Sequence, residues 1–230
     1  MKSMFVVILM MMLTGSGVWS KPILEISSKL HDFGMLPKNS VLFHVFQLKS
    51  TGTDTVRIDE IKTGCACAIS KMKQDWIAPG DSLDMEISWN IHGFRSSLFR
   101  SIRIFYNGNP DPVRVSLKGM VVEHPDSLRP LSISPYRFEL ASTPLKNIDS
   151  VAFKITNYDD HDLKLQSTSP KLEQCVLVLP STVPAKSSAT GYIRLNPEYD
   201  SLEFETSVTI VADDFKHTKL TVPIRRKFYR

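Results

Sequence analysis

The sequence lacks several features on which large protein classes depend. Three cysteines in 230 residues are too few for a fold held together by disulfides. The apolar run over residues 4–13 is about half as long as a bilayer requires, and no second run is long enough. Beyond this run, no apolar pattern with sustained helical spacing occurs. These absences argue against a disulfide scaffold, a set of transmembrane helices and a helical bundle.

An excess of charge of one sign is also lacking. Lys and Arg number 28 against 24 for Asp and Glu, which gives a net charge of +4 with both signs interspersed. Such a balance predicts neither nucleic acid nor an acidic surface as a partner, and the interleaved aromatic and basic residues of an RNA-binding motif are absent. The basic residues near the C-terminus are interpreted as a solvated chain end: Arg225, Arg226, Lys227 and Arg230.

Recognisable catalytic motifs are missing as well. No serine lies in a GxSxG frame, and no glycine-rich loop is built to cradle a phosphate. The densest polar cluster, residues 159–162, combines three aspartates with His161, a set that would suit a cation. Because Asp side chains bond nearby backbone groups, we expect a solvated turn there. The sequence therefore predicts a protein that is not an enzyme, with no catalytic residue, no metal ligand and no cofactor.

What is present at the N-terminus is the pattern of a secretory signal peptide. Lys2 precedes the apolar run of residues 4–13, and the small residue Ser20 ends the segment before Lys21. No cysteine follows the run, so the acylated cysteine of a lipoprotein is missing. We expect residues 1–20 to be cleaved and the mature protein to be periplasmic or secreted, with no stable membrane insertion.

Short runs of alternating apolar and polar residues fill the rest of the chain. Clusters of Gly, Pro, Asn, Asp and Ser separate these runs, which is typical of β-strands joined by turns. Short strands at this spacing favour a β-sandwich or barrel. The expected strands of the first half are residues 41–48, 55–61, 82–90, 99–106 and 112–118.

The second half repeats the first at a nearly constant offset. Phe46 matches Phe153 at an offset of 107 residues, and Ile102 matches Val208 at an offset of 106. Since a slip of one residue would turn a strand inside out, a constant offset over several strands is informative. The matched apolar positions form the expected core: Leu24, Ile26, Phe46, Val56, Ile58, Ile87, Trp89, Ile102, Ile104, Val113, Val115 and Leu117, with Leu131, Ile133, Phe153, Leu163, Leu165, Ile193, Leu195, Val208, Ile210, Leu220, Val222 and Ile224.

This repeat predicts two domains joined by a polar linker. Residues 123–130 contain two prolines, which cannot donate to a β-ladder. We therefore expect a first β-sandwich over residues 21–122, a linker over 123–130 and a second sandwich over 131–230. The short linker predicts that the two domains touch or sit at restricted angles.

The first domain carries an ordered set of motifs that resembles a known family. The motifs are His31-Asp32-Phe33-Gly34, Ser50-Thr51-Gly52, Gly64-Cys65-Ala66-Cys67-Ala68, Ile77-Ala78-Pro79-Gly80 and Leu117-Lys118-Gly119. Together they resemble the bacterial domain of unknown function 1573, an immunoglobulin-like module common in envelope proteins of Bacteroidetes. The resemblance covers about residues 24–122 and implies an all-β fold of two tandem immunoglobulin-like sandwiches. The second domain is similar in architecture only, since it lacks the cysteine pair.

Cys65 and Cys67 are the sharpest chemical feature, and three interpretations remain open. The pair lines a turn as a local structural disulfide, or acts as a redox pair whose reactivity depends on a depressed thiol pKa. Alternatively, the two thiolates bind zinc or copper(I) with one or two of His31, His44 and His92. An oxidising compartment favours the disulfide.

Cys175 is left over from this pair. It alternates with Leu177 and Leu179 in a run with strand spacing, which predicts a buried thiol. The repeat aligns it with Ala68 and not with either cysteine of the pair. A disulfide between the domains would therefore require close packing of the two.

Phe99, Arg103 and Phe105 form a candidate binding surface, called the aromatic-basic stripe below. Strand alternation places them on one face, and Ile102, Ile104 and Tyr106 on the other. If the aliphatic face is the inner one, the stripe is exposed and suits contact with a protein or glycan. The alternative is that Phe99 and Phe105 pack beneath a loop or the second domain.

The sequence therefore predicts an exported, non-catalytic binding or assembly module of the bacterial cell envelope, whose partner is an envelope protein or glycan. The alternative from another class is a periplasmic thiol-redox or metal-binding protein that uses Cys65 and Cys67.

Overall fold

The computed structural model describes residues 20–123, 128–169 and 172–229. The expected signal peptide lies outside these residues except for Ser20, as does most of the expected linker. Within the described ranges the regular elements are β-strands and one short 3₁₀-helix, Pro197–Tyr199, which confirms the all-β fold. No helix in these ranges combines the length and apolar character needed to cross a membrane.

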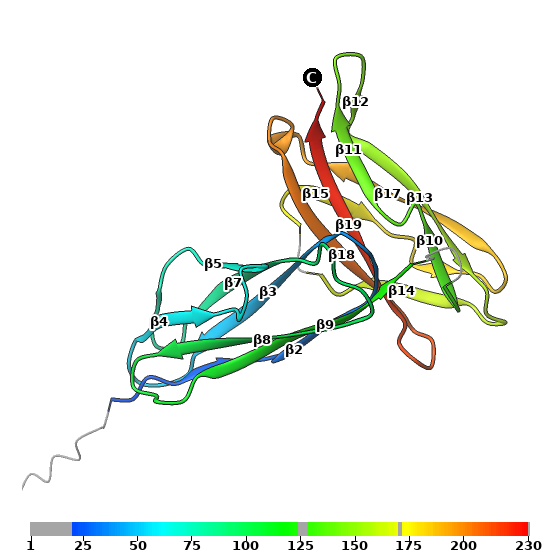
Figure 1. Cartoon of the computed structure of the whole chain (residues 1–230). Coiled ribbons are helices and arrows are strands. Elements are labelled where there is room, and N and C mark those ends of the chain that lie inside the picture. Colours follow the sequence, from blue (N-terminus) through cyan, green and yellow to red (C-terminus); the bar gives the residue numbers. More distant parts are fainter. Residues whose placement is uncertain (1–19, 124–127, 170–171, 230) are drawn as a thin grey trace, which may run out of the picture.

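The first half of the chain forms a sandwich of two sheets (Figure 1). One sheet has the order β1-β3-β7-β5, and the other contains β2-β9-β8-β4-β6. Apolar residues two apart give each strand one buried face, so the two sheets bury these faces against each other. The strands are β1 (Leu24–Ile26), β2 (Leu30–Pro37), β3 (Val41–Ser50), β4 (Val56–Lys62), β5 (Ala68–Lys71), β6 (Trp76–Ile77), β7 (Ser82–Asn90), β8 (Ser97–Tyr106) and β9 (Val113–Val122).

The second half repeats this arrangement. One sheet has the order β10-β13-β17-β15. The other contains β16-β14-β18-β19, and β11 pairs with β19 in parallel. This pairing matches the parallel pairing of β2 with β9 in the first half. Apart from β12, which has no counterpart in the first half, each strand follows its counterpart at about the offset that the sequence indicates. The strands are β10 (Leu131–Ser134), β11 (Phe138–Ser142), β12 (Asn147–Ile148), β13 (Ser150–Asn157), β14 (Leu163–Ser167), β15 (Cys175–Val178), β16 (Thr182–Val183), β17 (Ser188–Leu195), β18 (Phe204–Ala212) and β19 (Lys219–Phe228).

Each sandwich has its own hydrophobic core. Nearly all of the apolar positions expected to be inside are buried, with Trp89 and Phe46 among the largest side chains of the first core. Val113 differs, since it lies at the start of β9 and is only partly buried against that core. The five strands expected in the first half are also found, with ends shifted by a few residues.

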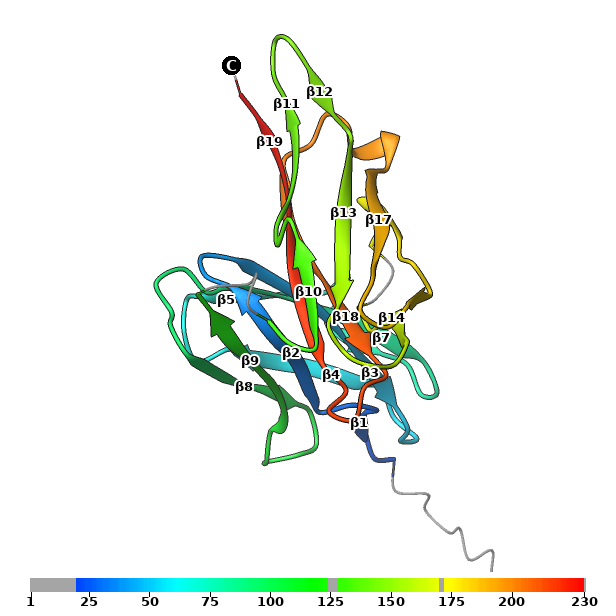
Figure 2. The same cartoon turned by 90° about the vertical axis from the view of Figure 1, so that its right-hand side faces the viewer.

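The two halves meet along β2 and β19, and β3 packs beside β18 (Figure 2). Leu220 of β19 pairs in parallel with Met35 of β2, so one sheet runs through both halves. The Thr221 hydroxyl donates to the carbonyl oxygen of Phe33 at 2.6 Å, and the Phe43 amide donates to Ser207 Oγ at 2.9 Å. The halves therefore touch through hydrogen bonds of the main chain and not only through side-chain packing. The boundaries expected at residues 122 and 131 stay a prediction.

The basic C-terminal segment is not the solvated end that the sequence indicated. Residues 219–228 form β19, and the Arg226 side chain is 1% exposed because alternation turns it inward. Its guanidinium donates to Asp200 Oδ1 at 2.8 Å and to Asn147 Oδ1 at 3.0 Å. Arg225, on the other face, pairs with Glu139 at 2.8 Å. The interpretation as a solvated chain end was therefore wrong for Arg226.

Candidate functional site

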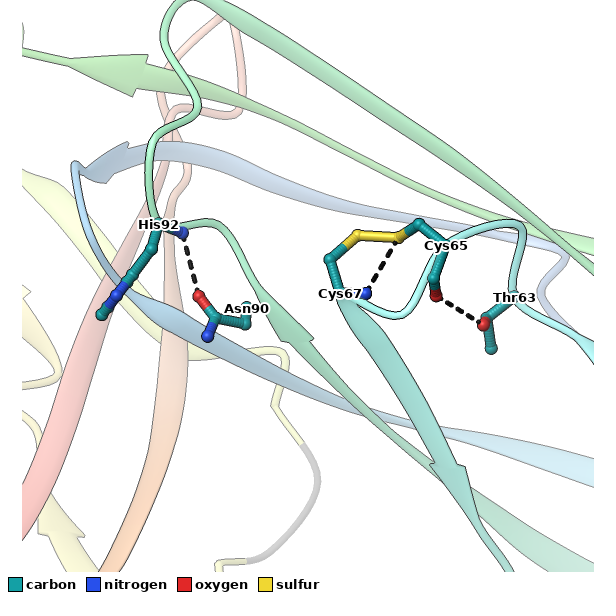
Figure 3. Close-up of a disulfide and its surroundings, with 5 residues drawn as sticks. All are labelled: Thr63, Cys65, Cys67, Asn90 and His92. Carbon is teal, nitrogen blue, oxygen red and sulfur yellow. Dashed lines mark hydrogen bonds between the residues drawn. A yellow bond between two sulfur atoms is a disulfide. The ribbon is translucent and has the colours of Figure 1, made fainter.

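Cys65 and Cys67 lie in the loop between β4 and β5, where they form a disulfide (Figure 3). Their Cα atoms are 5.2 Å apart. Gly64 has a φ of +77°, a backbone conformation that a side chain disfavours, and this turn brings the next residues back toward β5. The Thr63 hydroxyl donates to the Cys65 carbonyl oxygen at 3.0 Å, and the Cys67 amide donates to Cys65 Sγ at 3.2 Å. The loop is thus fixed locally as well as by the sulfur–sulfur bond.

The disulfide covers one side of the first core. Both cysteines are half-buried and pack against the core, and Ala68, the next residue, pairs with Trp89 of β7. The Arg100 guanidinium lies over the Trp89 ring at 5.9 Å, and its Nη1 would lie 3.8 Å from a Cβ on Gly64. The positively charged Arg100 side chain therefore lies beside the disulfide loop and next to the Trp89 ring.

A hollow of about 390 Å³ borders the disulfide on the outer side. Its lining combines apolar groups with Ser88, Asn90 and His92. The His92 amide donates to Asn90 Oδ1 at 2.9 Å, while the imidazole extends away from the two sulfur atoms (Figure 3). The hollow can take a small group, but His92 and the sulfur atoms do not converge on one point.

The expected metal ligands are not brought together. The two sulfur atoms are bonded to each other, which leaves no thiolate to bind a soft ion. His31 and His44 instead stack on one another, with ring centroids 3.6 Å apart. Across the described ranges, no group of three or more His, Cys, Asp or Glu side chains is placed to hold a metal ion. The mixed Cys–His site therefore has no assembled ligand set in this part of the chain.

The stacked histidines lie where the first sandwich meets the second. The rings of Phe33 and Phe46 contact them edge-on, and a cavity of about 360 Å³ separates them from Thr168 and Lys219. Burial, with a smaller contribution from Lys219, lowers the pKa of His31 to about 4. Burial, with a smaller contribution from His31, lowers the pKa of His44 to about 3. His31 Nε2 and His44 Nδ1 have no hydrogen-bond partner, so both rings are held neutral by their surroundings.

The aromatic-basic stripe faces outward from β8. Phe99 is 65% exposed and Arg103 is exposed, whereas the neighbouring Leu98, Ile102 and Ile104 are buried. Phe105 is half-buried, with Lys62 Nζ 5.0 Å from its ring centroid. The stripe is therefore not covered by a loop or by the second sandwich at Phe99.

The strands beside the stripe add further positive charge. In the sheet register Arg103 stands opposite Arg114, and Phe99 stands opposite Lys118. Lys118 pairs with Asp32 at 3.2 Å, while Arg103 and Arg114 form no ion pair with any residue that the structure describes. The outer face of β8 and β9 thus offers an exposed ring and two unpaired guanidinium groups on a rigid sheet.

Two other expectations are confirmed. Cys175 is a free, buried thiol, and burial raises its pKa to about 12. Residues 159–162 form an exposed turn between β13 and β14, where Asp160 pairs with Lys186 at 2.9 Å. Sequence reasoning missed the stacking of His31 on His44, although both stand on inward positions of their strands.

Comparison with known proteins finds a family-model match for the first sandwich. The model of a protein family of unknown function, DUF1573, matches residues 24–121, in agreement with the motifs of the first domain. No curated protein matches the chain significantly.

Several solved structures share parts of the architecture. A protein of unknown function from Porphyromonas gingivalis W83 has 10% identity and a TM-score of 0.37, covering 89% of this chain and 99% of that one. The YadV chaperone has 10% identity and a TM-score of 0.33, covering 88% and 98%. A PapD-like domain of human CEP192 has 13% identity and a TM-score of 0.36, covering 44% and 85%. The sandwich fold is assigned from the strand pairing and the buried faces, not from these likenesses.

Proposed function

We propose that this chain is an exported, non-catalytic binding or assembly module of the bacterial cell envelope. In this proposal the outer face of β8 and β9 binds an envelope protein or glycan. The observation that carries the proposal is that the exposed ring of Phe99 lies on the same outer face as the guanidinium groups of Arg103 and Arg114. These groups lie four residues along the paired strands and form no ion pair with any described residue.

The chemistry of this face suits binding. Aromatic rings and arginine are enriched where proteins meet their partners, because a ring gives contact area with little loss of conformational freedom and a guanidinium gives directed hydrogen bonds. The buried residues Ile102 and Ile104 fix the strand from behind, so the face needs little ordering on binding. A partner that offers apolar surface together with anionic or hydroxyl groups fits it best.

Export is supported by two features of the chain. The N-terminal pattern is that of a cleavable secretory signal, and the Cys65–Cys67 disulfide belongs with an oxidising compartment. A periplasmic or secreted location is proposed on these grounds. Mass spectrometry of the mature N-terminus tests it, since a protein that still began at Met1 would contradict export.

The binding proposal is tested with the tagged mature protein in a pull-down from its own envelope fraction. Phe99→Ala combined with Arg103→Glu should reduce capture of the specific partner at least tenfold, with little change in melting temperature. Phe215→Ala is the matched control, because Phe215 is 99% exposed on the second sandwich. Equal capture by the parent, the double variant and the control would contradict a binding role for the stripe.

A second candidate function, thiol–disulfide exchange, is favoured by the half-buried disulfide that borders a hollow. Cys65→Ser with Cys67→Ser separates the two proposals. A binding module should still capture its partner, whereas an exchange protein should lose its activity toward a thiol or disulfide probe. Thiol titration of the native protein in glutathione buffers, with metal analysis of the same sample, completes the test. A pair that stays oxidised in all mild buffers would remove the redox candidate.

A further inference from the structure

The second sandwich has an open groove along one side. Its volume is about 900 Å³, and it lies between β15, the end of β14 and the middle of β18. The groove floor is apolar and reaches the second core through Cys175 and Val208, both buried. The lining residues are Ser167, Ser169, Leu172, Glu173, Cys175, Val176, Leu177, Leu179, Asn196, Glu198, Tyr199 and Val208.

β15 presents an unpaired edge beside this groove. Among the strands that the structure describes, it pairs only with β17. The Asn196 amide donates to the Gln174 carbonyl oxygen at 2.8 Å, which places Gln174 at a hydrogen-bonded position of the antiparallel pair. Because such positions alternate, the backbone N–H and C=O groups of Cys175 and Leu177 point away from β17, toward the open edge. These groups are a template for another strand.

The first sandwich covers its core at the equivalent place, although β5 also ends its sheet and pairs only with β7 among the described strands. There β5 begins at Ala68, the counterpart of Cys175, and the loop before it is tied by the disulfide. Cys65 and Cys67 of that loop pack onto the first core. The second sandwich has no disulfide in the loop before β15, and two described residues of that loop, Ser169 and Leu172, line the groove.

The rim of the groove carries negative charge. Glu173 and Glu198 are exposed, and none of the described residues that line the groove is Lys or Arg. Tyr199 donates its hydroxyl to Glu173 Oε2 at 3.2 Å, which holds that carboxylate at the rim. A binding segment therefore needs apolar side chains for the floor and a basic side chain for the rim.

We propose that β15 takes up an extended segment of a partner protein as an added strand. The segment has apolar side chains at alternate positions, which enter the groove beside Cys175 and Leu177, and a Lys or Arg that reaches Glu173 or Glu198. Main-chain hydrogen bonds supply affinity in this mode and alternate side chains supply specificity. The surface is separate from the aromatic-basic stripe, so either proposal can fail without the other.

Three synthetic nine-residue peptides test the proposal with the full mature protein. The first alternates Val with Lys or Ser, the second contains the same residues with the valines in one block, and the third is the first peptide methylated on alternate amide nitrogens. We expect the first peptide to bind at least tenfold more tightly than the other two. Titration calorimetry measures the affinity, and hydrogen exchange should show protection at the amides of Cys175 and Leu177.

Cys175 gives an independent readout. It is the free cysteine of the chain and lines the groove. Because burial raises its pKa to about 12, its alkylation at pH 9 is slow and reports on how readily a reagent reaches the thiol through the groove. The alternating peptide should slow this alkylation at least fivefold, and the methylated peptide should not.

Charge reversal tests the rim. Glu173→Lys with Glu198→Lys should weaken binding of the alternating peptide at least tenfold. Glu25→Lys with Asp84→Lys, which changes the net charge equally on the first sandwich, should leave its affinity unchanged. The peptide comparison uses the parent protein alone, so it holds if a variant fails to fold.

Three outcomes would overturn the proposal. Equal affinities for all three peptides would indicate nonspecific apolar contact. An absence of saturable binding at millimolar peptide would show that the edge does not accept a strand. Concentration-dependent dimerisation that protects Cys175 and Leu177 would identify a second copy of this chain as the occupant.

Discussion

At the residue scale, Arg226 illustrates how a charged side chain is accommodated inside a small sandwich. Its guanidinium reaches Asp200, Asn147 and the Ile148 carbonyl oxygen, while its Nε has no partner. Burying a charge costs free energy unless hydrogen bonds replace its water. Arg226 therefore ties the last strand to the β12 hairpin and to the segment after the 3₁₀-helix, and its role depends on geometry as well as charge.

Arg226→Ala should destabilise the second sandwich by about 2–4 kcal/mol, because it leaves a cavity and unpaired acceptors. Arg225→Ala is the control, since its pair with Glu139 is partly exposed and should be worth at most about 1 kcal/mol. Urea unfolding of both variants measures the difference. Equal losses would mean that the buried hydrogen bonds of Arg226 add nothing.

The histidine pair predicts a specific response to pH. The unfolded chain takes up protons on both residues near the ordinary pKa of 6.5, whereas the folded chain does so only near 4 for His31 and 3 for His44. Between these values the unfolded state binds more protons, so stability is full above about pH 6.5 and falls as the pH falls. The slope should approach about 1.4 kcal/mol per pH unit for each histidine.

His31→Leu with His44→Leu should flatten this dependence between pH 6.5 and 4.5. His92→Leu, which changes an exposed ring on the first sandwich, should leave it as in the parent. Urea midpoints measured across this pH range give the comparison. A double variant that keeps the parent's pH profile would show that the stacked pair is not its source.

At the element scale, β8 and β18 show what alternation can and cannot predict. The pattern of apolar residues predicted the buried face of each strand: Ile102 and Ile104 match Val208 and Ile210 in the repeat, and all four side chains are buried. It placed Phe99 outside for the same reason. Alternation identifies the two faces of a strand, but it does not identify which outward residues another element covers.

The exposed and buried rings of the two sandwiches should respond very differently to truncation. Phe99→Ala should change the free energy of unfolding by no more than about 0.5 kcal/mol, because the ring is largely in water. Phe153→Ala should cost about 3–5 kcal/mol, because that ring is 1% exposed and stacks on Phe138 at 4.8 Å. Thermal and urea unfolding measure both. A large loss for Phe99→Ala would assign the ring a structural role.

At the scale of the whole molecule, the short linker predicted that the two sandwiches touch or sit at restricted angles, but the sequence did not predict which strands join them. The repeat offset located the strands of each half, and the motifs of the first half indicated the family whose model matches residues 24–121. The pairing of Met35 with Leu220, and the bond from Thr221 to Phe33, join residues far apart in sequence and leave no periodic signal. The burial of Arg226 could not be predicted for a similar reason, because its hydrogen-bond acceptors come from other segments of the chain.

Gly34 is the position where this junction is most sensitive to a side chain. Its φ is +64°, and a Cβ there would overlap the carbonyl oxygen of Lys219. Gly34→Ala should therefore separate β2 from β19 and split thermal unfolding into two transitions. Gly80→Ala is the control, because Gly80 has a φ of +86° but open space around it. Calorimetry distinguishes them, and a single unchanged transition for Gly34→Ala would contradict this role.

The shared sheet also has a consequence for the period during which the chain is synthesised. The edge of β2 that faces the second sandwich has no partner until Leu220 and Thr221 of β19 have emerged. During that interval the first sandwich carries an open strand edge, which can pair with another chain. A cell that makes this protein has a reason to keep neighbouring copies apart until the last strand is complete.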